Sequence, residues 1–481
     1  MTEHRTGTRP GAAVTVTGAA LGVDMFLYGC IVPLLPGLPA VDGSPLTAGV
    51  LFAVYAAALL AATPFIGVWV DRRGPRTPML AGLLGLAAAT VLFAWAVDVE
   101  GGSGLALLLA ARAAQGIAAA SSWTAGLALI AATHAPEQRG KAMGLALSAV
   151  GMGVLLGPAV GGLLSDLWGP RAPFLVVAAL AAGDAVARVV LIRETPPPQA
   201  RASYRAVLRG PRVALLIALT GLGAAAIAFP EPVLPLHLDE LGLGTTAIGL
   251  VFAGAALGGS LAAPVAGLLT DRAGATRIAS VGALVAAAGF FLSGRDSAFW
   301  SVTGLIVVGF GAQLVLAPTL VLIGALAEHT DPPSYGAAYA VYNLAYTGGL
   351  TVAPITAGAA AKAFDVPVTT LFACGLAIVI ALALVARRDQ PGTGTAKSPT
   401  RPHRVSPRTR STPGCGRTRG GPCAARRMRP GRKPAPAPAD ATVAGSTYSS
   451  ALSTKNRCGL VTPNSSRRVS SAARRLPVAA A

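Results

Sequence analysis

Long apolar segments alternate with short charged or Gly/Pro-rich breaks over most of the chain. A helix needs about 20 mostly apolar residues to cross a hydrocarbon layer about 30 Å thick. By that criterion we predict twelve membrane-spanning helices at residues 14–37, 46–70, 78–97, 105–132, 142–165, 172–192, 213–237, 246–270, 277–294, 299–327, 336–361 and 367–386. The pattern therefore predicts an all-α membrane protein.

The longest break between spans, residues 193–212, divides the predicted helices into two sets of six. It contains five arginines and the run Pro196–Pro198, which is typical of a linker. We expect a cytoplasmic N-terminus (1–13), an N-terminal six-helix bundle (14–192), a cytoplasmic linker (193–212), a C-terminal six-helix bundle (213–386) and a basic, disordered cytoplasmic tail (387–481).

The two halves repeat each other. The residues around the end of the second span recur around the end of the eighth span, each 200 positions later: Gly67, Asp71, Arg72 and Gly74 return as Gly267, Asp271, Arg272 and Gly274. The segment Pro33-Leu-Leu-Pro36 also returns, 199 positions later, as Pro232-Val-Leu-Pro235. A duplication with parallel topology predicts a substrate site between the halves, near the membrane midplane.

Composition agrees with a membrane protein, because 53% of the residues are hydrophobic and only 12% are charged. The net charge of +19 does not point to nucleic acid, since residues 391–481 hold 18 of the 39 basic residues and one of the 20 acidic ones. Among residues 1–390, sixteen basic residues lie in segments on the same side of the membrane as the N-terminus. Only Arg171, Arg295 and Lys362 lie in loops on the opposite side. This asymmetry predicts that both termini are cytoplasmic. We expect a multi-pass protein of the plasma (inner) membrane.

The basic tail has too few large apolar residues to form a core. It either touches anionic lipid head groups or is a non-selected extension without a role in transport, and we favour the second interpretation. The five cysteines form no paired CxxC motif, so we expect no metal site.

Asp24 is the first candidate for chemistry. It lies ten residues after Val14, roughly 15 Å along a helix and therefore near the middle of the bilayer. A charge there costs at least about 2.5–3.5 kcal/mol. Asp24 is thus expected to face a wet cavity or to hold a proton.

Glu231 is a second acid within a span, on the seventh helix, which the repeat makes equivalent to the first. If both acids line the cavity, a lipophilic cation and a proton could compete for them. The alternative is an interfacial position, because about 18 residues of the predicted helix precede Glu231. A third acid, Asp184, lies four residues before Arg188, and we expect these two to neutralise each other on one helix face.

Several motifs give the chain a resemblance to the major facilitator superfamily, over residues 14–386. The GxxxDRxG pattern formed by Gly67, Asp71, Arg72 and Gly74 resembles the superfamily's cytoplasmic motif. The resemblance implies a cytoplasmic latch in which Asp71 faces a helix N-terminus of the opposite half, where the helix dipole favours an anion. The copy of the motif at Asp271 favours this interpretation. A plain charged turn at the membrane surface is the alternative.

Two further motifs resemble the twelve-span drug:proton antiporters of this superfamily. The fifth span carries a sequence similar to the antiporter motif, with Gly153, Gly157, Pro158, Gly161 and Gly162. Small residues at these spacings let another helix approach closely. The segment around Arg112 resembles the fourth-span motif, in which a buried arginine is tied to proton transfer; the alternative is that Arg112 merely binds backbone carbonyls.

A narrower likeness is to the vesicular monoamine transporters and their bacterial multidrug-exporting relatives. Asp24 with the Pro33–Pro36 segment and Glu231 with its flanking prolines carry it. The monoamine carriers have a lysine at the position of Tyr55 and an aspartate at that of Asn343. Residues that could shape the pocket are Tyr28, Tyr342, Asn343 and Tyr346.

The resemblance predicts a secondary transporter that exports small lipophilic or cationic compounds in exchange for protons by alternating access. We expect no enzyme activity, cofactor or nucleic-acid partner, and a monomer in the lipid bilayer. One alternative is a solute importer of the same fold, either a symporter or a uniporter. Another is a membrane-tethered interaction protein whose basic tail binds lipid or nucleic acid.

Overall fold

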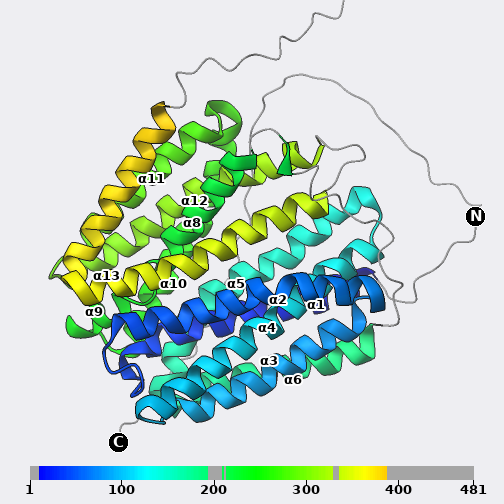
Figure 1. Cartoon of the computed structure of the whole chain (residues 1–481), viewed down its shortest axis with the longest axis horizontal. Helices are drawn as coiled ribbons and strands as arrows, with labels where there is room; N and C mark the ends of the chain where they lie inside the picture. The colour runs from blue at the N-terminus through cyan, green and yellow to red at the C-terminus, as the bar shows by residue number, and fades with distance from the viewer. Residues whose placement is uncertain (1–9, 193–207, 211–212, 329–334, 387–481) are drawn as a thin grey trace, which may run out of the picture. The chain divides into compact units, whose positions relative to one another are not determined.

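The computed structural model describes residues 10–192, 208–210, 213–328 and 335–386. Within these ranges every regular element is helical (Figure 1). The first half contains α1 (Pro10–Ile31), η1 (Val32–Gly37), α2 (Pro45–Arg73), α3 (Arg76–Ala96), α4 (Gly101–Thr133), α5 (Pro136–Trp168) and α6 (Ala172–Leu191). The second contains α8 (Val213–Ala228), α9 (Leu234–Glu240), α10 (Thr245–Ala273), α11 (Ala275–Ser293), α12 (Ala298–Glu328) and α13 (Tyr335–Ala386).

These helices make up the twelve predicted spans and confirm the all-α membrane class. Ten stretches of the described chain are long and apolar enough to cross a membrane. The longest of them belongs to α13, whose 52 residues are two helices joined at Asp365, where φ is 66° and ψ is 167°. The remaining span begins with α8, which has 16 residues and continues into α9 after a break.

That break is the main departure from the predicted helices. The predicted span 213–237 is interrupted after Ala228 and resumes at Leu234. Pro230 and Pro232 lie in the interruption, and neither has a backbone N–H to donate to a helix. Glu231 between them is therefore on a turn rather than on a continuous helix. The first span is not interrupted, but it changes at Val32 from α1 to the short 3₁₀ helix η1, which contains Pro33.

Contacts between helices fall into two sets joined by a few pairs. In the first half α1 packs on α4, α5 and α6, while α4 packs on α2 and α3. In the second half α12 packs on α8, α10 and α11, while α13 packs on α8 and α11. The principal contacts between the sets are α2 with α13 and α5 with α10. The predicted linker lies outside the described residues except for 208–210, and so does the whole predicted tail 387–481.

Small residues bring the two halves into backbone contact at one end of the bundle. A Cβ on Gly49 would collide with the carbonyl of Pro354, and a Cβ on its repeat partner Gly249 would collide with that of Pro158. Nearby, Gly358 lies against Pro45, and a Cβ on Gly162 would be 2.7 Å from the carbonyl oxygen of Thr245. We call this region, where the starts of α2 and α10 meet α13 and α5, the closed end. Its contacts depend on glycine because any side chain would force the helices apart.

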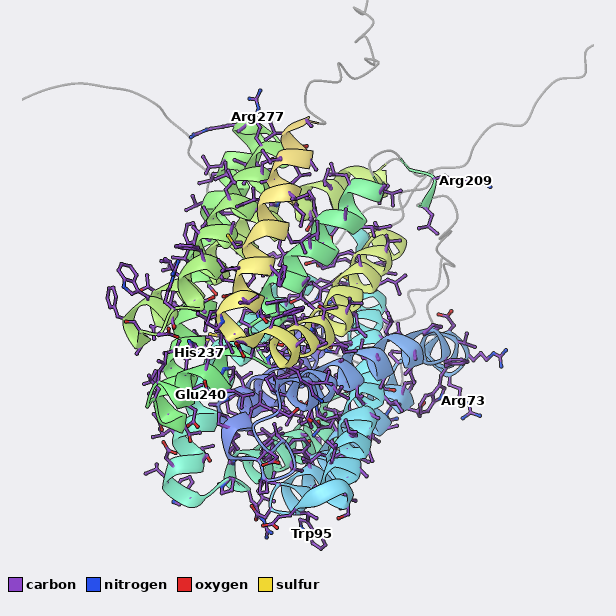
Figure 2. All side chains as sticks on the ribbon, turned by 60° about the vertical axis from the view of Figure 1, so that its left-hand side comes forward. Arg73, Trp95, Arg209, His237, Glu240 and Arg277 are labelled. Atoms are coloured by element: carbon purple, nitrogen blue, oxygen red, sulfur yellow. The ribbon has the colours of Figure 1, made fainter. Side chains whose placement is uncertain are left out.

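The opposite end carries the repeated motif turns. Helices α2 and α10 both end at a glycine with positive φ, Gly74 (74°) and Gly274 (87°). L-residues with side chains rarely adopt this conformation, so the glycine is needed to end the helix there. Figure 2 shows Arg73, Arg209 and Arg277 toward this side of the molecule. We call it the motif end.

Candidate functional site

Asp24 is completely buried on α1 and is held by donors from two other helices. The hydroxyl of Tyr55, on α2, lies 2.9 and 2.8 Å from the two carboxylate oxygens. The indole Nε1 of Trp123, on α4, donates to Oδ2 at 2.8 Å. Both of these donors are uncharged. Among the described residues, Asp24 is therefore positioned by neutral hydrogen-bond donors and not by an ion pair.

Arg112 lies beside this cluster and is also completely buried. Its Nε donates to the carbonyl oxygen of Leu51 at 3.1 Å, and its Nη1 donates to Oε1 of Gln115 at 3.0 Å. The guanidinium carbon lies 4.4 Å from the ring centroid of Tyr55, a cation–π contact. Its Nη2 has no hydrogen-bond partner among the described residues. Arg112 thus places a buried positive charge within electrostatic range of both Asp24 and Glu231.

Glu231 connects the second half of the chain to α1. The hydroxyl of Tyr28 donates to Oε2 of Glu231 at 2.6 Å. Tyr28 lies one helical turn after Asp24, and its ring centroid is 5.5 Å from that of Tyr55. Asp24 and Glu231, one from each half, each accept a hydrogen bond from a tyrosine, and the rings of these two tyrosines lie next to each other. We call these two acids the carboxylate pair. Glu231 is buried inside the protein, with 7% of its surface exposed.

The structure brings the main candidates together and adds Tyr55 and Trp123 as hydrogen-bond partners of Asp24. Tyr346 lies close enough to Glu231 and Tyr28 to interact electrostatically with both. Tyr342 stacks on Tyr346 with ring centroids 6.0 Å apart, whereas the side chain of Asn343 is exposed.

Sequence reasoning missed Tyr55 and Trp123 as ligands of Asp24. Tyr55 stands where the monoamine carriers have a lysine, and this position indicated that its side chain faces the site. Trp123 had none, because an aromatic residue in a span is usually a packing residue.

The phenol of Tyr55 provides a prediction that can be tested at this site. Tyr55→Phe keeps the ring beside Arg112 but removes the hydroxyl that both oxygens of Asp24 accept from. A hydrogen bond to a charged group contributes about 1.5–3 kcal/mol, so we expect proton-driven transport to fall by about 10-fold or more. Transport in proteoliposomes measures this. An unchanged rate at unchanged melting temperature would show that the hydroxyl does not position Asp24.

The antiporter motif packs α5 on two different helices. Built Cβ atoms on Gly153 and Gly157 would collide with the backbone of Gly22 and Phe26 on α1, and one on Gly161 would lie 2.8 Å from Cα of Cys30. Pro158 and Gly162 instead face the start of α10 in the other half. The motif residues therefore hold α5 both to its own half and to the opposite half.

The two latch motifs at the motif end show little contact in this conformation. Asp71, Arg72 and Arg272 are exposed, and a Cβ on Gly67 or Gly267 would meet nothing within 4 Å. The side chain of Asp271 lies outside the described residues. A latch at these positions stays a prediction.

Asp184 and Arg188 form a separate buried polar site on α6. Nη2 of Arg188 donates to the carbonyl oxygen of Pro75 at 3.1 Å. Within the described part of the chain, Nε and Nη1 of Arg188 and Oδ2 of Asp184 have no hydrogen-bond partner. The arginine is thus tied to the turn before α3 and not bonded through those atoms to the nearby acid.

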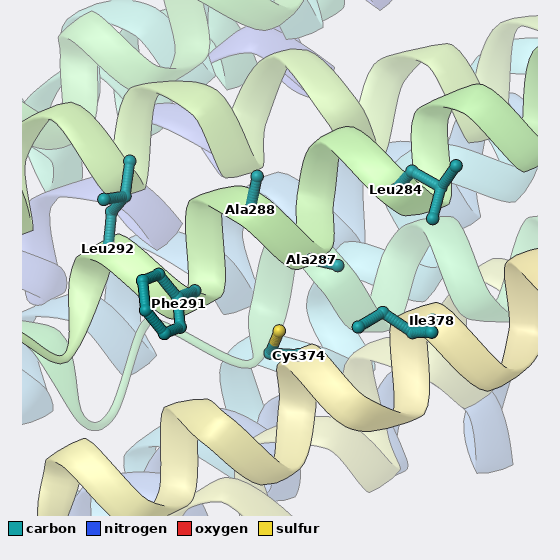
Figure 3. A pocket seen from close by; sticks show the side chains of 7 residues that line it. All are labelled: Leu284, Ala287, Ala288, Phe291, Leu292, Cys374 and Ile378. Atoms are coloured by element: carbon teal, nitrogen blue, oxygen red, sulfur yellow. The ribbon is translucent and has the colours of Figure 1, made fainter.

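An apolar groove of about 400 Å³ runs between α11 and the last part of α13 (Figure 3). It is lined by Leu284, Ala287, Ala288, Phe291, Leu292, Cys374 and Ile378. None of these side chains carries a charge, so the groove is chemically distinct from the carboxylate pair.

Comparison with known protein families agrees with this architecture. The model of the Major Facilitator Superfamily matches residues 17–324 and 213–442. The chain belongs to this superfamily. It is accordingly a multi-pass membrane protein.

Curated relatives of this superfamily member include vesicular transporters. The synaptic vesicular amine transporter of Mus musculus is 31% identical over 328 residues, which cover 66% of this chain and 62% of the relative. The vesicular acetylcholine transporter of Homo sapiens is 31% identical over 329 residues, covering 64% and 59%. The matched region therefore spans less than two thirds of the length of these relatives.

Solved structures share the fold at low sequence identity. A bacterial homolog of the human lysosomal transporter Spinster superposes with a TM-score of 0.63 at 15% identity, covering 78% of this chain and 95% of that one. The nucleoside transporter NupG gives 0.62 at 13% identity, covering 78% and 99%. These similarities establish the major facilitator fold for the described helices.

Proposed function

We propose that this transporter exports small lipophilic or cationic compounds in exchange for protons, by alternating access of a site between its halves. The observation that carries the proposal is the carboxylate pair. Asp24 and Glu231 are both buried, come from different halves and accept hydrogen bonds from neutral phenols. Arg112 is the fixed positive charge near both.

The mechanism follows from the cost of burying charge. An ionised carboxylate inside the membrane is expensive unless a proton or a cation neutralises it. A cationic substrate and a proton therefore compete for Asp24 and Glu231, and each binds where the other has left. Rocking of the halves then exposes the loaded site to one side at a time. Proton entry from one side drives substrate release to that side.

The relatives support a cation as the substrate class. Their names state amines and acetylcholine, and acetylcholine is a permanent cation. This chain has the neutral Tyr55 and Asn343 where the monoamine carriers have a lysine and an aspartate. We therefore propose a cation of broader, more lipophilic type, because fewer fixed charges remain to orient one particular ligand.

The location we propose is the plasma (inner) membrane, with both termini cytoplasmic. The asymmetry of basic residues supports this orientation, which makes the motif end cytoplasmic and the closed end external. We further propose that the protein works as a monomer, since each chain supplies both halves of the site.

A susceptibility panel in a host that lacks its own pumps tests the proposal. We expect resistance to lipophilic cations such as tetraphenylphosphonium and ethidium, and none to anionic compounds of similar size. Everted vesicles give the direction: ethidium should accumulate inside them when the lumen is acidic. Accumulation only in right-side-out vesicles would show an importer instead.

Deleting residues 391–481 is expected to leave resistance and ethidium transport unchanged, because the tail has the composition of a segment that cannot fold. Transport assays of a chain truncated after Gln390 provide the measurement. Loss of transport at equal membrane abundance would assign the tail a role. The interaction-protein alternative would be favoured by a different result: neither the full-length nor the truncated chain transports, and the full-length chain binds lipid or nucleic acid in a salt-dependent way.

A further inference from the structure

We propose that Asp166 is a positioning residue for the transport cycle: it latches the closed end by capping helix α10 across the boundary between the halves. This inference rests on the proposed alternating access. It adds a specific residue that sets the balance between closed and open forms at this end.

The contact itself joins α5 of the first half to α10 of the second. Asp166 lies two residues before the end of α5. Its Oδ2 accepts a hydrogen bond from the backbone N–H of Thr246 at 3.0 Å and another from the hydroxyl of Thr246 at 2.5 Å. Thr246 is the second residue of α10. An acceptor at that position is what the first turn of a helix requires, because its N–H groups have no partner within the helix.

Helix α10 does not have a side-chain cap of its own. Its N-cap residue is Gly244, with φ −74° and ψ 170°. The equivalent helix of the first half, α2, has Ser44 at the N-cap position 200 residues earlier, and the Ser44 side chain accepts from the backbone N–H of Thr47 at 3.3 Å. The repeat therefore provides an internal comparison. Helix α2 is capped by Ser44 of its own half, whereas α10 is capped by Asp166 of the opposite half.

The second comparison concerns the capping side chain. Asp166 is four residues after Gly162, so both lie on one face of α5. Gly162 contacts the carbonyl of Thr245, and in the other crossing Gly358 contacts that of Pro45. Four residues after Gly358 the chain has Lys362, which is exposed. A cation cannot accept from backbone N–H groups and is disfavoured at a helix N-terminus. The latch is therefore built into only one of the two crossings at the closed end.

The consequence is a state-dependent helix cap. When the halves separate at this end, Thr246 loses both hydrogen bonds and the anion leaves the positive end of the α10 dipole. Losing an N-cap shifts an equilibrium by about fivefold, with a range of about two- to thirtyfold. Removing Asp166 should thus raise the ratio of open to closed molecules by a factor of this size. A cap that served only to stabilise the helix would have no effect on that ratio.

Distances between spin labels at the closed end provide the test. The labels are attached through Gly102→Cys in the first half and Asp296→Cys in the second, in the full chain with its five native cysteines replaced by alanine. The distance between them reports whether the halves are together or apart at this end. Both positions are exposed, and Gly102 has nothing within 4 Å of a built Cβ. We expect Asp166→Ala to increase the long-distance population relative to the short one by about fivefold. Lys362→Ala, the matched change at the other crossing, should leave the ratio unchanged.

A rescue variant separates the latch from simple helix capping. Gly244→Ser gives α10 a cap like that of α2, and nothing within 4 Å obstructs its Cβ. Combined with Asp166→Ala it should restore the melting temperature but not the distance distribution. The proposal is overturned if Asp166→Ala leaves the distances unchanged, or if Gly244→Ser restores them. Thr246→Val, which keeps the backbone N–H, should give a smaller shift and covers the case in which Asp166→Ala does not fold. Because these distances need neither substrate nor proton gradient, the latch can hold even if the export assay fails.

Discussion

Asp24→Asn is expected to abolish the response of transport to a proton gradient. The asparagine has nearly the same shape and can still accept from Tyr55 and Trp123, but it cannot take up or release a proton. The buried site would then lose the ionised form that attracts a cation. Because a hydrogen bond to a charged acceptor contributes about 1.5–3 kcal/mol, proton-driven transport of the cation should fall by about 10- to 150-fold. Ethidium uptake into everted vesicles, with and without an imposed pH gradient, measures this loss.

A matched control for that change is Asp42→Asn. Asp42 is exposed in the loop after η1 with a positive φ of 48°, a conformation that asparagine also tolerates. Its transport should equal that of the wild type. If Asp24→Asn retained gradient-dependent uptake while folding normally, Asp24 would not be the proton site.

Glu231→Gln is expected to have the second largest effect, and on the cation more than on the fold. The amide oxygen can still accept from the hydroxyl of Tyr28, so the link between α1 and the broken span is kept. The negative charge that attracts a bound cation is lost. The positive charge of Arg112 then repels the cation with less compensation from nearby acids. We expect the dissociation constant for tetraphenylphosphonium to rise by more than about 10-fold, the factor that corresponds to 1.4 kcal/mol.

Equilibrium dialysis with the purified protein measures that binding. Glu240→Gln is the control, since Glu240 is an exposed acid at the end of α9, 4.0 Å from His237. It should bind the probe as the wild type does. Equal affinity in Glu231→Gln and wild type would remove Glu231 from the binding site.

The helices could be predicted because the membrane imposes a length and a composition on each span. Turn residues such as Gly74 and Gly274 marked the helix ends, and their spacing of 200 positions revealed the duplication. The break at Glu231 was not predicted, although Pro230 and Pro232 signal it. A long apolar run hides such a break, because hydropathy does not distinguish a helix from a turn inside the protein.

The two carboxylates could be predicted as site candidates because charged residues are rare inside membrane spans, so Asp24 and Glu231 stand out in the sequence. Their partners could not, because hydrogen bonding depends on how each helix is rotated about its axis. Tyr55, Trp123 and Gln115 come from α2 and α4, and nothing in the order of residues states which face of those helices meets α1. The same applies to Arg112, whose sequence motif predicts burial but not its bond to the carbonyl of Leu51.

The closed end shows the same limit. The motif glycines Gly157 and Gly162 indicate close packing, but not that one faces α1 and the other α10. Asp166 had no signal of its own in the sequence, because an acid at the end of a span is an ordinary surface residue. Its role follows only from the position of Thr246 in the folded chain.

Competition between proton and cation at one pair of carboxylates is the central claim. It is tested most directly by adding tetraphenylphosphonium to the purified protein in weakly buffered detergent and recording the pH. Protons should be released from the wild type as the cation binds, and release should disappear in the Asp24→Asn, Glu231→Gln double variant. Binding of the cation to the wild type without any proton release would contradict the account.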